Sequence, residues 1–275
     1  MEYDAFQTSP VSLALDSLHT SAFHRGLGAS VLVSPATEIH ATEVESYAAK
    51  AYTRSNLVIV ASGASADDLK PQIEEFWKDL PVGESLKTSP SKYVGGESRI
   101  PHRLSQNVFA MGFPGGSLYG SNVGPEYIVL SHLLGGPSNI KWSTGHSALA
   151  KLSSAISPSV STLATNLPYS DAGLFAILIA GSAADVAKMA TATIKLLRDI
   201  AKGSYAIKPE EVKRAIASAR YSTYATAEAR LSGLEPIGQA VLDTGKLLDL
   251  NPLVSLFDKV TPEKLKQAVA RFNSL

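Results

Sequence analysis

The sequence predicts an α+β fold in which an antiparallel sheet is covered by helices on one face. Three short apolar runs have the length of strands, at residues 107–113, 159–166 and 173–180. A turn-like segment, Pro168-Tyr-Ser-Asp171, separates the last two and allows them to pair as antiparallel neighbours. Helical periodicity dominates after residue 182, so strands and helices do not alternate as they would in a doubly wound α/β fold.

The first 80 residues predict three helices and one strand. Residues 11–24 repeat apolar side chains at i, i+3 and i+7 after a Ser-Pro start, which is typical of a capped amphipathic helix. The run from Asn56 to Ser62 is continuously apolar and ends at Gly63, which predicts a short strand. Two further helices are expected on either side of it, at about 41–52 and 66–80.

A change of character at residue 81 predicts a domain boundary. Pro, Gly, Ser and Lys accumulate without a period, and we predict a linker over residues 83–101. Residues 1–82 are then the C-terminal part of a first domain whose opening strands are missing, and residues 102–275 are a complete second domain. The helices expected in the second domain lie at about 124–134, before 154, at 183–202, from 209 onward, at 231–246 and at 262–272.

Composition excludes several classes of protein. The 25 basic and 25 acidic side chains give a net charge of zero, which argues against binding nucleic acid or an anionic membrane through the overall field. The chain has no cysteine, and therefore no disulfide, thiolate metal site or cysteine nucleophile. Only 18% of residues are charged, which favours a sizeable core and surface covered by partners.

No run is long enough to predict a membrane-spanning helix. The nearest, Ala172–Ala180, has the length of a strand and stops at Gly181. The N-terminus, Met1-Glu2-Tyr3-Asp4, is acidic where a targeting peptide would be basic. We therefore expect a soluble globular protein without a targeting segment in this chain.

The six histidines do not predict a metal site. A zinc-binding helix needs two histidines one turn apart beside a glutamate, and the nearest match, His40-Ala-Thr-Glu43, continues with Val44. His19 and His24 are five residues apart and point in different directions on a helix. Structural or solvent roles are expected for these side chains.

Motifs for nucleophilic catalysis or phosphate binding are also missing. No G-x-S-x-G elbow occurs, and the segment from Gly83 to Thr88 lacks the glycine that precedes the lysine of a phosphate loop. Turns and element ends explain the glycines near Gly26, Gly112 and Gly135 more simply. We expect no catalytic, cofactor-binding or metal-ligating residue in this chain.

One polar segment stands out. In Lys141-Trp-Ser-Thr-Gly-His146, a Trp and a His share a loop, but no titratable group nearby in the sequence could orient the imidazole. A partner contact or packed loop is therefore favoured over catalysis. The pair Glu210-Glu211 and the alternating charges of Lys208–Arg214 predict an exposed first helical turn.

Several ordered segments resemble pitrilysin-type zinc metallopeptidases. Together they cover nearly the whole chain, in the order that the family has. The second half of a first family domain is resembled by Asp16–Phe23, Gly26-Leu-Gly28 and Tyr52–Val60 with Gly63. The C-terminal homologous domain is resembled by Asn166–Phe175 and Lys208–Ala215. The region where the zinc motif would lie is absent from the chain, and Glu2 without a histidine pair would bind zinc poorly.

Within this family, Leu133–Trp142 is most similar to the fungal core subunits of mitochondrial respiratory complex III, because it lacks the long glycine-rich loop of the non-catalytic processing-peptidase subunit. The resemblance implies a non-catalytic structural role without a cofactor. It also implies pairing with core protein 1 in a dimeric complex on the matrix side of the inner membrane, which the chain would contact only through other subunits. The alternative is a processing-peptidase subunit or a zinc metallopeptidase that binds or cleaves presequences.

Overall fold

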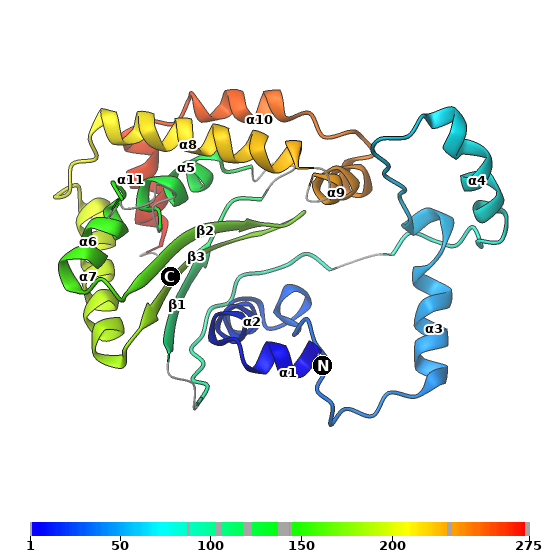
Figure 1. The fold of residues 1–275 in the computed structure, drawn as a ribbon, viewed down its shortest axis with the longest axis horizontal. Helices are drawn as coiled ribbons and strands as arrows, with labels where there is room; N and C mark the ends of the chain where they lie inside the picture. Colours follow the sequence, from blue (N-terminus) through cyan, green and yellow to red (C-terminus); the bar gives the residue numbers. More distant parts are fainter. Residues whose placement is uncertain are drawn as a thin grey trace. The chain divides into compact units, whose positions relative to one another are not determined.

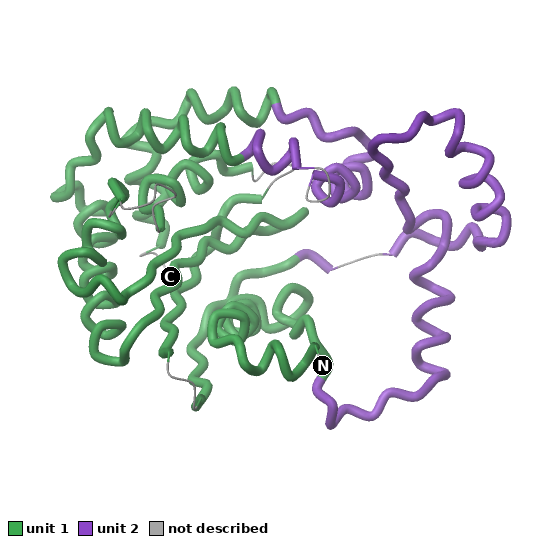
Figure 2. Tube along the Cα trace, in the orientation of Figure 1, with its two compact units in different colours: residues 1–33, 91–222, 251–275 green, residues 34–90, 223–250 purple. Residues whose placement is uncertain are grey.

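The computed structural model describes residues 2–86, 89–102, 106–117, 123–136, 143, 145–229 and 233–272. The chain forms two compact units, which Figure 2 distinguishes by colour. Unit 1 comprises residues 1–33, 91–222 and 251–275, and unit 2 comprises residues 34–90 and 223–250. The division expected from the sequence, with a first domain over residues 1–82, a linker over 83–101 and a second domain over 102–275, stays a prediction.

Unit 1 contains a three-stranded antiparallel sheet in the order β1-β3-β2 (Figure 1). The strands are β1 (Asn107–Pro114), β2 (Ser161–Pro168) and β3 (Gly173–Gly181). All nine residues of β3 are buried, because a neighbour lies on each edge and helices cover its faces. The prediction of these strands is confirmed, with each boundary within two residues of the expected one.

Most helices of unit 1 cover one face of this sheet. They are α5 (Pro125–Leu134), α6 (Ala148–Ile156), α7 (Ala183–Lys202), the first part of α8 (Pro209–Glu228), α10 (Leu250–Phe257) and α11 (Pro262–Arg271). Phe272, directly after α11, stacks on Phe113 of β1 with ring centroids 4.3 Å apart. Helix α7 begins at the N-cap Ser182 and ends at Gly203, whose φ of 81° suits glycine. The short helix α10 is absent from the sequence-based expectations.

Helix α2 (Pro10–Phe23), preceded by the short α1 (Glu2–Gln7), packs against the other side of β1. A Cβ added at Gly112 would meet the Leu18 side chain at 2.9 Å, so this glycine allows the helix to approach the strand. The His19 ring is held at both nitrogens, by Leu15 O at 2.7 Å and by Tyr169 Oη at 2.6 Å. The first contact lies within α2, and the second attaches the helix to the segment that joins β2 to β3.

Unit 2 contains α3 (Ala41–Ala51), the short 3-10 turn η2 (Arg54–Asn56), α4 (Ala66–Lys78) and α9 (Leu234–Thr244). The strand expected over residues 56–62 is wrong, because residues 57–62 are irregular. The described residues of unit 2 contain no strand with which this run could pair, and a lone strand leaves its backbone groups to water. Its Ile59 side chain is 44% exposed.

Across the described residues, no helix combines the length and the apolar character that crossing a bilayer requires.

Candidate functional site

The structure places His146, singled out by the sequence, at the rim of a small cavity in unit 1. The cavity has a volume of about 140 Å³ and lies where the end of α5, the start of α6 and the first turns of α8 meet. Trp142, the other notable residue of that loop, lies outside the described residues. The polar or charged side chains lining the cavity are His132, His146, Ser147, Tyr205, Glu211, Arg214 and Ser218.

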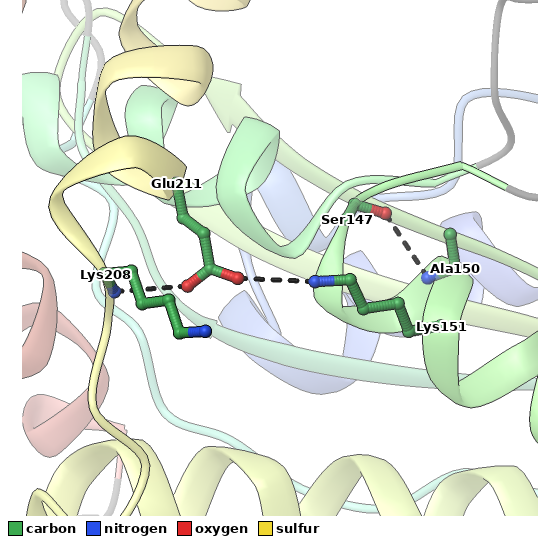
Figure 3. A network of polar contacts seen from close by, with 5 residues as sticks. All are labelled: Ser147, Ala150, Lys151, Lys208 and Glu211. Carbon is green, nitrogen blue, oxygen red and sulfur yellow. Dashed lines mark hydrogen bonds and ion pairs between the residues drawn. The ribbon is translucent and has the colours of Figure 1, made fainter.

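Glu211 lines this cavity, and Figure 3 shows its carboxylate between Lys208 and Lys151. Its Oε1 lies 3.4 Å from Lys151 Nζ, and its Oε2 accepts a hydrogen bond of 3.2 Å from the backbone N–H of Lys208. The Glu211 side chain is only 13% exposed, whereas that of Lys151 is 54% exposed. The carboxylate therefore joins α6 to the start of α8, with its own side chain largely shielded from solvent and its lysine partner exposed.

This position corrects one expectation. Glu211 does lie in the first turn of α8, but its side chain is not on an exposed face. The sequence contains the relevant signal, because Glu211 is the third residue of a helix that starts at Pro209. A glutamate there accepts from the N–H of the residue before the helix, in this case Lys208. The signal could not reveal Lys151, which is 60 residues away in the sequence.

The Glu211 carboxylate also affects the pKa of Tyr205. Burial raises the pKa of the Tyr205 phenol, and the charge of Glu211 and a hydrogen bond to it raise that pKa further. The phenol therefore stays protonated at neutral pH and can act as a hydrogen-bond donor.

His132 lines the same cavity as His146, although the two histidines are not close in the sequence. Burial lowers the pKa of the His132 imidazole, which favours the neutral ring at pH 7. Its Nδ1 lies 3.0 Å from Ser218 Oγ on α8. In the described part of the chain the ring makes no other hydrogen bond, whereas a catalytic histidine is oriented by a third group.

Gly135 and Ser147 shape the loop at the cavity. Gly135 ends α5 with a φ of 73°, and a Cβ added to it would collide with the Ser147 side chain. Ser147 caps α6 by accepting a hydrogen bond of 3.3 Å from the Ala150 N–H (Figure 3). The contacts between these described side chains therefore hold α5, α6 and α8 together, which is a structural role.

The remaining histidine motif also has a structural explanation. In His40-Ala-Thr-Glu43, Glu43 Oε2 accepts a hydrogen bond of 2.9 Å from the His40 N–H at the start of α3. Glutamate at this spacing is part of a helix cap. Among the described residues, no three His, Asp or Glu side chains are grouped so that they could hold a metal ion.

Comparison with known proteins gives matches over nearly all of the chain. Residues 38–219 match the family model described as "Peptidase M16 inactive domain". The chain is 38% identical to cytochrome b-c1 complex subunit 2 of Neurospora crassa over 94% of this chain and 57% of that protein. It is 32% identical to the subunit of the same name in Schizosaccharomyces pombe, over 98% of this chain and 61% of that protein. The chain therefore spans about three fifths of the length of these relatives.

A solved structure has the same fold. The chain is similar to a chain of "Complex III2 from Candida albicans, Inz-5 bound", with a TM-score of 0.81, 20% sequence identity, and coverage of 98% of this chain and 65% of that one. The α+β fold class expected from the sequence is confirmed by this likeness.

Proposed function

Since the chain belongs to the peptidase M16 family, in the part described as inactive, we propose that it is a non-catalytic structural subunit of the mitochondrial cytochrome b–c1 complex, or respiratory complex III. The observation that carries this proposal is the 38% identity, over 94% of the chain, to a subunit 2 of that complex. The proposed role is that of core protein 2. It would support assembly through pairing with core protein 1 in a dimeric complex at the matrix side of the inner membrane.

Two features of the chain support a structural role. Among the polar groups that line the small cavity, His132 contacts Ser218 and Glu211 contacts Lys151, and these contacts connect α5, α6 and α8. Unit 2 exposes several large apolar side chains, including Tyr47 at 68% and Phe76 at 57%, as expected of a surface covered in an assembly.

Co-purification tests this proposal. A tagged full-length chain, isolated from mitochondria in mild detergent, is expected to carry core protein 1 and the haem absorbance of cytochromes b and c1. Recovery of the chain alone, or with other partners only, would contradict the proposed membership.

A peptidase assay tests the alternative, a processing-peptidase subunit or zinc metallopeptidase. The full-length protein is expected to leave a presequence peptide uncut with or without added zinc. Cleavage that a chelator abolishes would overturn the non-catalytic reading.

A further inference from the structure

The small cavity between α5, α6 and α8 has a cation on its lining whose charge no described group balances. Arg214 lines the cavity one helical turn after Glu211, so both side chains lie on the same side of α8. In the described part of the chain, the Arg214 guanidinium makes no hydrogen bond and no ion pair, either with Glu211 or with Glu210. Glu211 is instead paired with Lys151. The positive charge of Arg214 is therefore available to an anion.

His132 and Ser218 add a neutral hydrogen-bond donor to the same cavity. Burial lowers the pKa of the His132 imidazole, which favours the neutral ring, and its Nδ1 lies 3.0 Å from Ser218 Oγ. A neutral ring has one N–H, and a hydroxyl can either donate to Nδ1 or accept from it. When Ser218 donates, the ring proton is on Nε2, which has no partner among the described residues. His132 can then donate to an anion without carrying a charge.

Glu211 adds an acceptor to these donors (Figure 3). An ionised carboxylate accepts about four hydrogen bonds. Three described groups contact this one, namely Lys151 Nζ at 3.4 Å, the Lys208 N–H at 3.2 Å and the Tyr205 phenol. About one acceptor position of Glu211 is therefore left. A ligand that satisfies the whole lining needs a negative charge for Arg214 and a proton to donate to Glu211.

The size of the cavity restricts the ligand to a small ion. Its volume of about 140 Å³ is well below the roughly 300–1,000 Å³ of pockets for drug-sized molecules, and equals that of roughly four waters. Inorganic phosphate suits this space, and at neutral pH it is an anion that keeps at least one proton. Sulfate keeps none, and a phosphate monoester, whose second pKa is about 6, has lost most of its proton. Inorganic phosphate therefore meets both requirements of the lining.

We propose that this cavity is a binding site for inorganic phosphate. The Arg214 guanidinium binds two of the oxygens, and His132 donates from Nε2 to a third. The P–OH group donates to the remaining acceptor position of Glu211. Since His132 is on α5 and the other two residues are on α8, the site exists only where these helices are packed together, and the bound ion stabilises that packing.

A titration of the full-length chain followed by phosphorus NMR at neutral pH tests the proposal. Saturable binding of inorganic phosphate is expected, with a Kd on the order of 1 mM. In competition, sulfate and glycerol phosphate are expected to bind at least tenfold more weakly, because neither ion brings the proton that Glu211 accepts. No saturation at about ten times the expected Kd, or equal competition by either analogue, would overturn the assignment.

Three variants locate the binding. Arg214→Gln is expected to weaken phosphate binding at least tenfold. Lys213→Gln is the matched control, because it removes the same charge from the adjacent exposed position outside the cavity, and it is expected to change the Kd less than about twofold. Glu211→Gln is expected to lose the preference for phosphate over sulfate, since an amide can donate to either ion.

Circular dichroism shows that each variant compared is folded. Equal weakening in Arg214→Gln and Lys213→Gln would mean that phosphate is attracted by general surface charge, and would refute the site. An unchanged preference for phosphate over sulfate in Glu211→Gln would refute the role of its carboxylate as the acceptor.

Discussion

The two compact units differ in how much of their own apolar surface they bury. The largest fully buried side chains, among them Phe175, Phe257 and Leu130, all lie in unit 1. In the described residues of unit 2, only Thr53, Gly233 and Ala240 are buried. Unit 1 therefore has a core of its own, and unit 2 has helices without one.

The difference shows that helical patterning and helical stability have separate sources. Helix α4 has the apolar spacing and the Ser65 cap of an ordinary packed helix, yet none of its residues is buried. Most stability of a helix in a protein comes from packing of its apolar face. Unit 2 is therefore expected to gain stability from whatever covers it, which agrees with the structural role proposed for the chain.

The largest expected contrast comes from two phenylalanines. Phe175→Ala in β3 removes a fully buried ring and is expected to lower the free energy of unfolding by about 3–5 kcal/mol. Phe76→Ala in α4 removes a ring that is 57% exposed and is expected to cost less than about 1 kcal/mol. Urea unfolding followed by circular dichroism measures both. Similar losses would mean that the two units do not differ as described.

Two glycines with positive φ give the next contrast. Gly135→Ala in unit 1 adds a Cβ that collides with Ser147 at a φ of 73°, and is expected to cost about 3 kcal/mol. Gly245→Ala in unit 2 has a φ of 69° but no atom within 4 Å of the new Cβ, so only backbone strain of about 1 kcal/mol is expected. The same unfolding measurement compares them, and a larger cost at Gly245 would contradict the prediction.

Glu211 and Glu210 are neighbours with different surroundings. Glu211→Gln weakens the contacts to Lys151 and Lys208 and is expected to cost about 1–2 kcal/mol, whereas the exposed Glu210→Gln is expected to be nearly neutral. Loss of the Glu211 charge should also lower the pKa of Tyr205, which absorbance titration detects. An unchanged tyrosine titration in Glu211→Gln would show that the two groups are not coupled.

The smallest effect concerns acidity. Burial lowers the pKa of His132, so below about pH 6.5 the unfolded chain binds a proton that the folded chain does not. His132 therefore contributes a loss of stability as the pH falls from about 6.5, and none above it. The variant His132→Asn is expected to show a flatter stability profile between about pH 5 and 7. The exposed His40→Asn serves as the control, and identical profiles for the two variants would refute this assignment.

The sequence predicted unit 1 better than unit 2 because local patterns there are matched by packing. The run 173–180 was expected to be a strand, and in the structure it has β1 and β2 on its two sides. The run 56–62 has a similar apolar pattern, but the part of unit 2 that the structure describes offers no neighbouring strand, and residues 57–62 stay irregular. A single sequence shows the tendency to form a strand but not the presence of a neighbour.

The residues that surround His146 could not be predicted either, because they are distant from it in the sequence. The loop was identified from its composition, but Glu211 and Tyr205 come from segments about 60 residues later, and His132 from the preceding helix. Glu211 was read as exposed because charged residues in a first helical turn usually are. Only the packing of α6 beside α8 reverses that reading, through the Lys151 contact.

The attachment of α2 has a consequence during synthesis. Its partners Gly112 and Tyr169 come about 90 to 150 residues after the helix itself. At a synthesis rate of roughly 5–20 residues per second, α2 waits about 5–30 seconds before the strand it covers and the tyrosine that fastens it have left the ribosome. During that interval Phe23, only 3% exposed in the finished fold, lacks the later members of its apolar cluster, among them Leu167 and Leu174. Helix α2 is thus made well before the contacts that fix it in place become available.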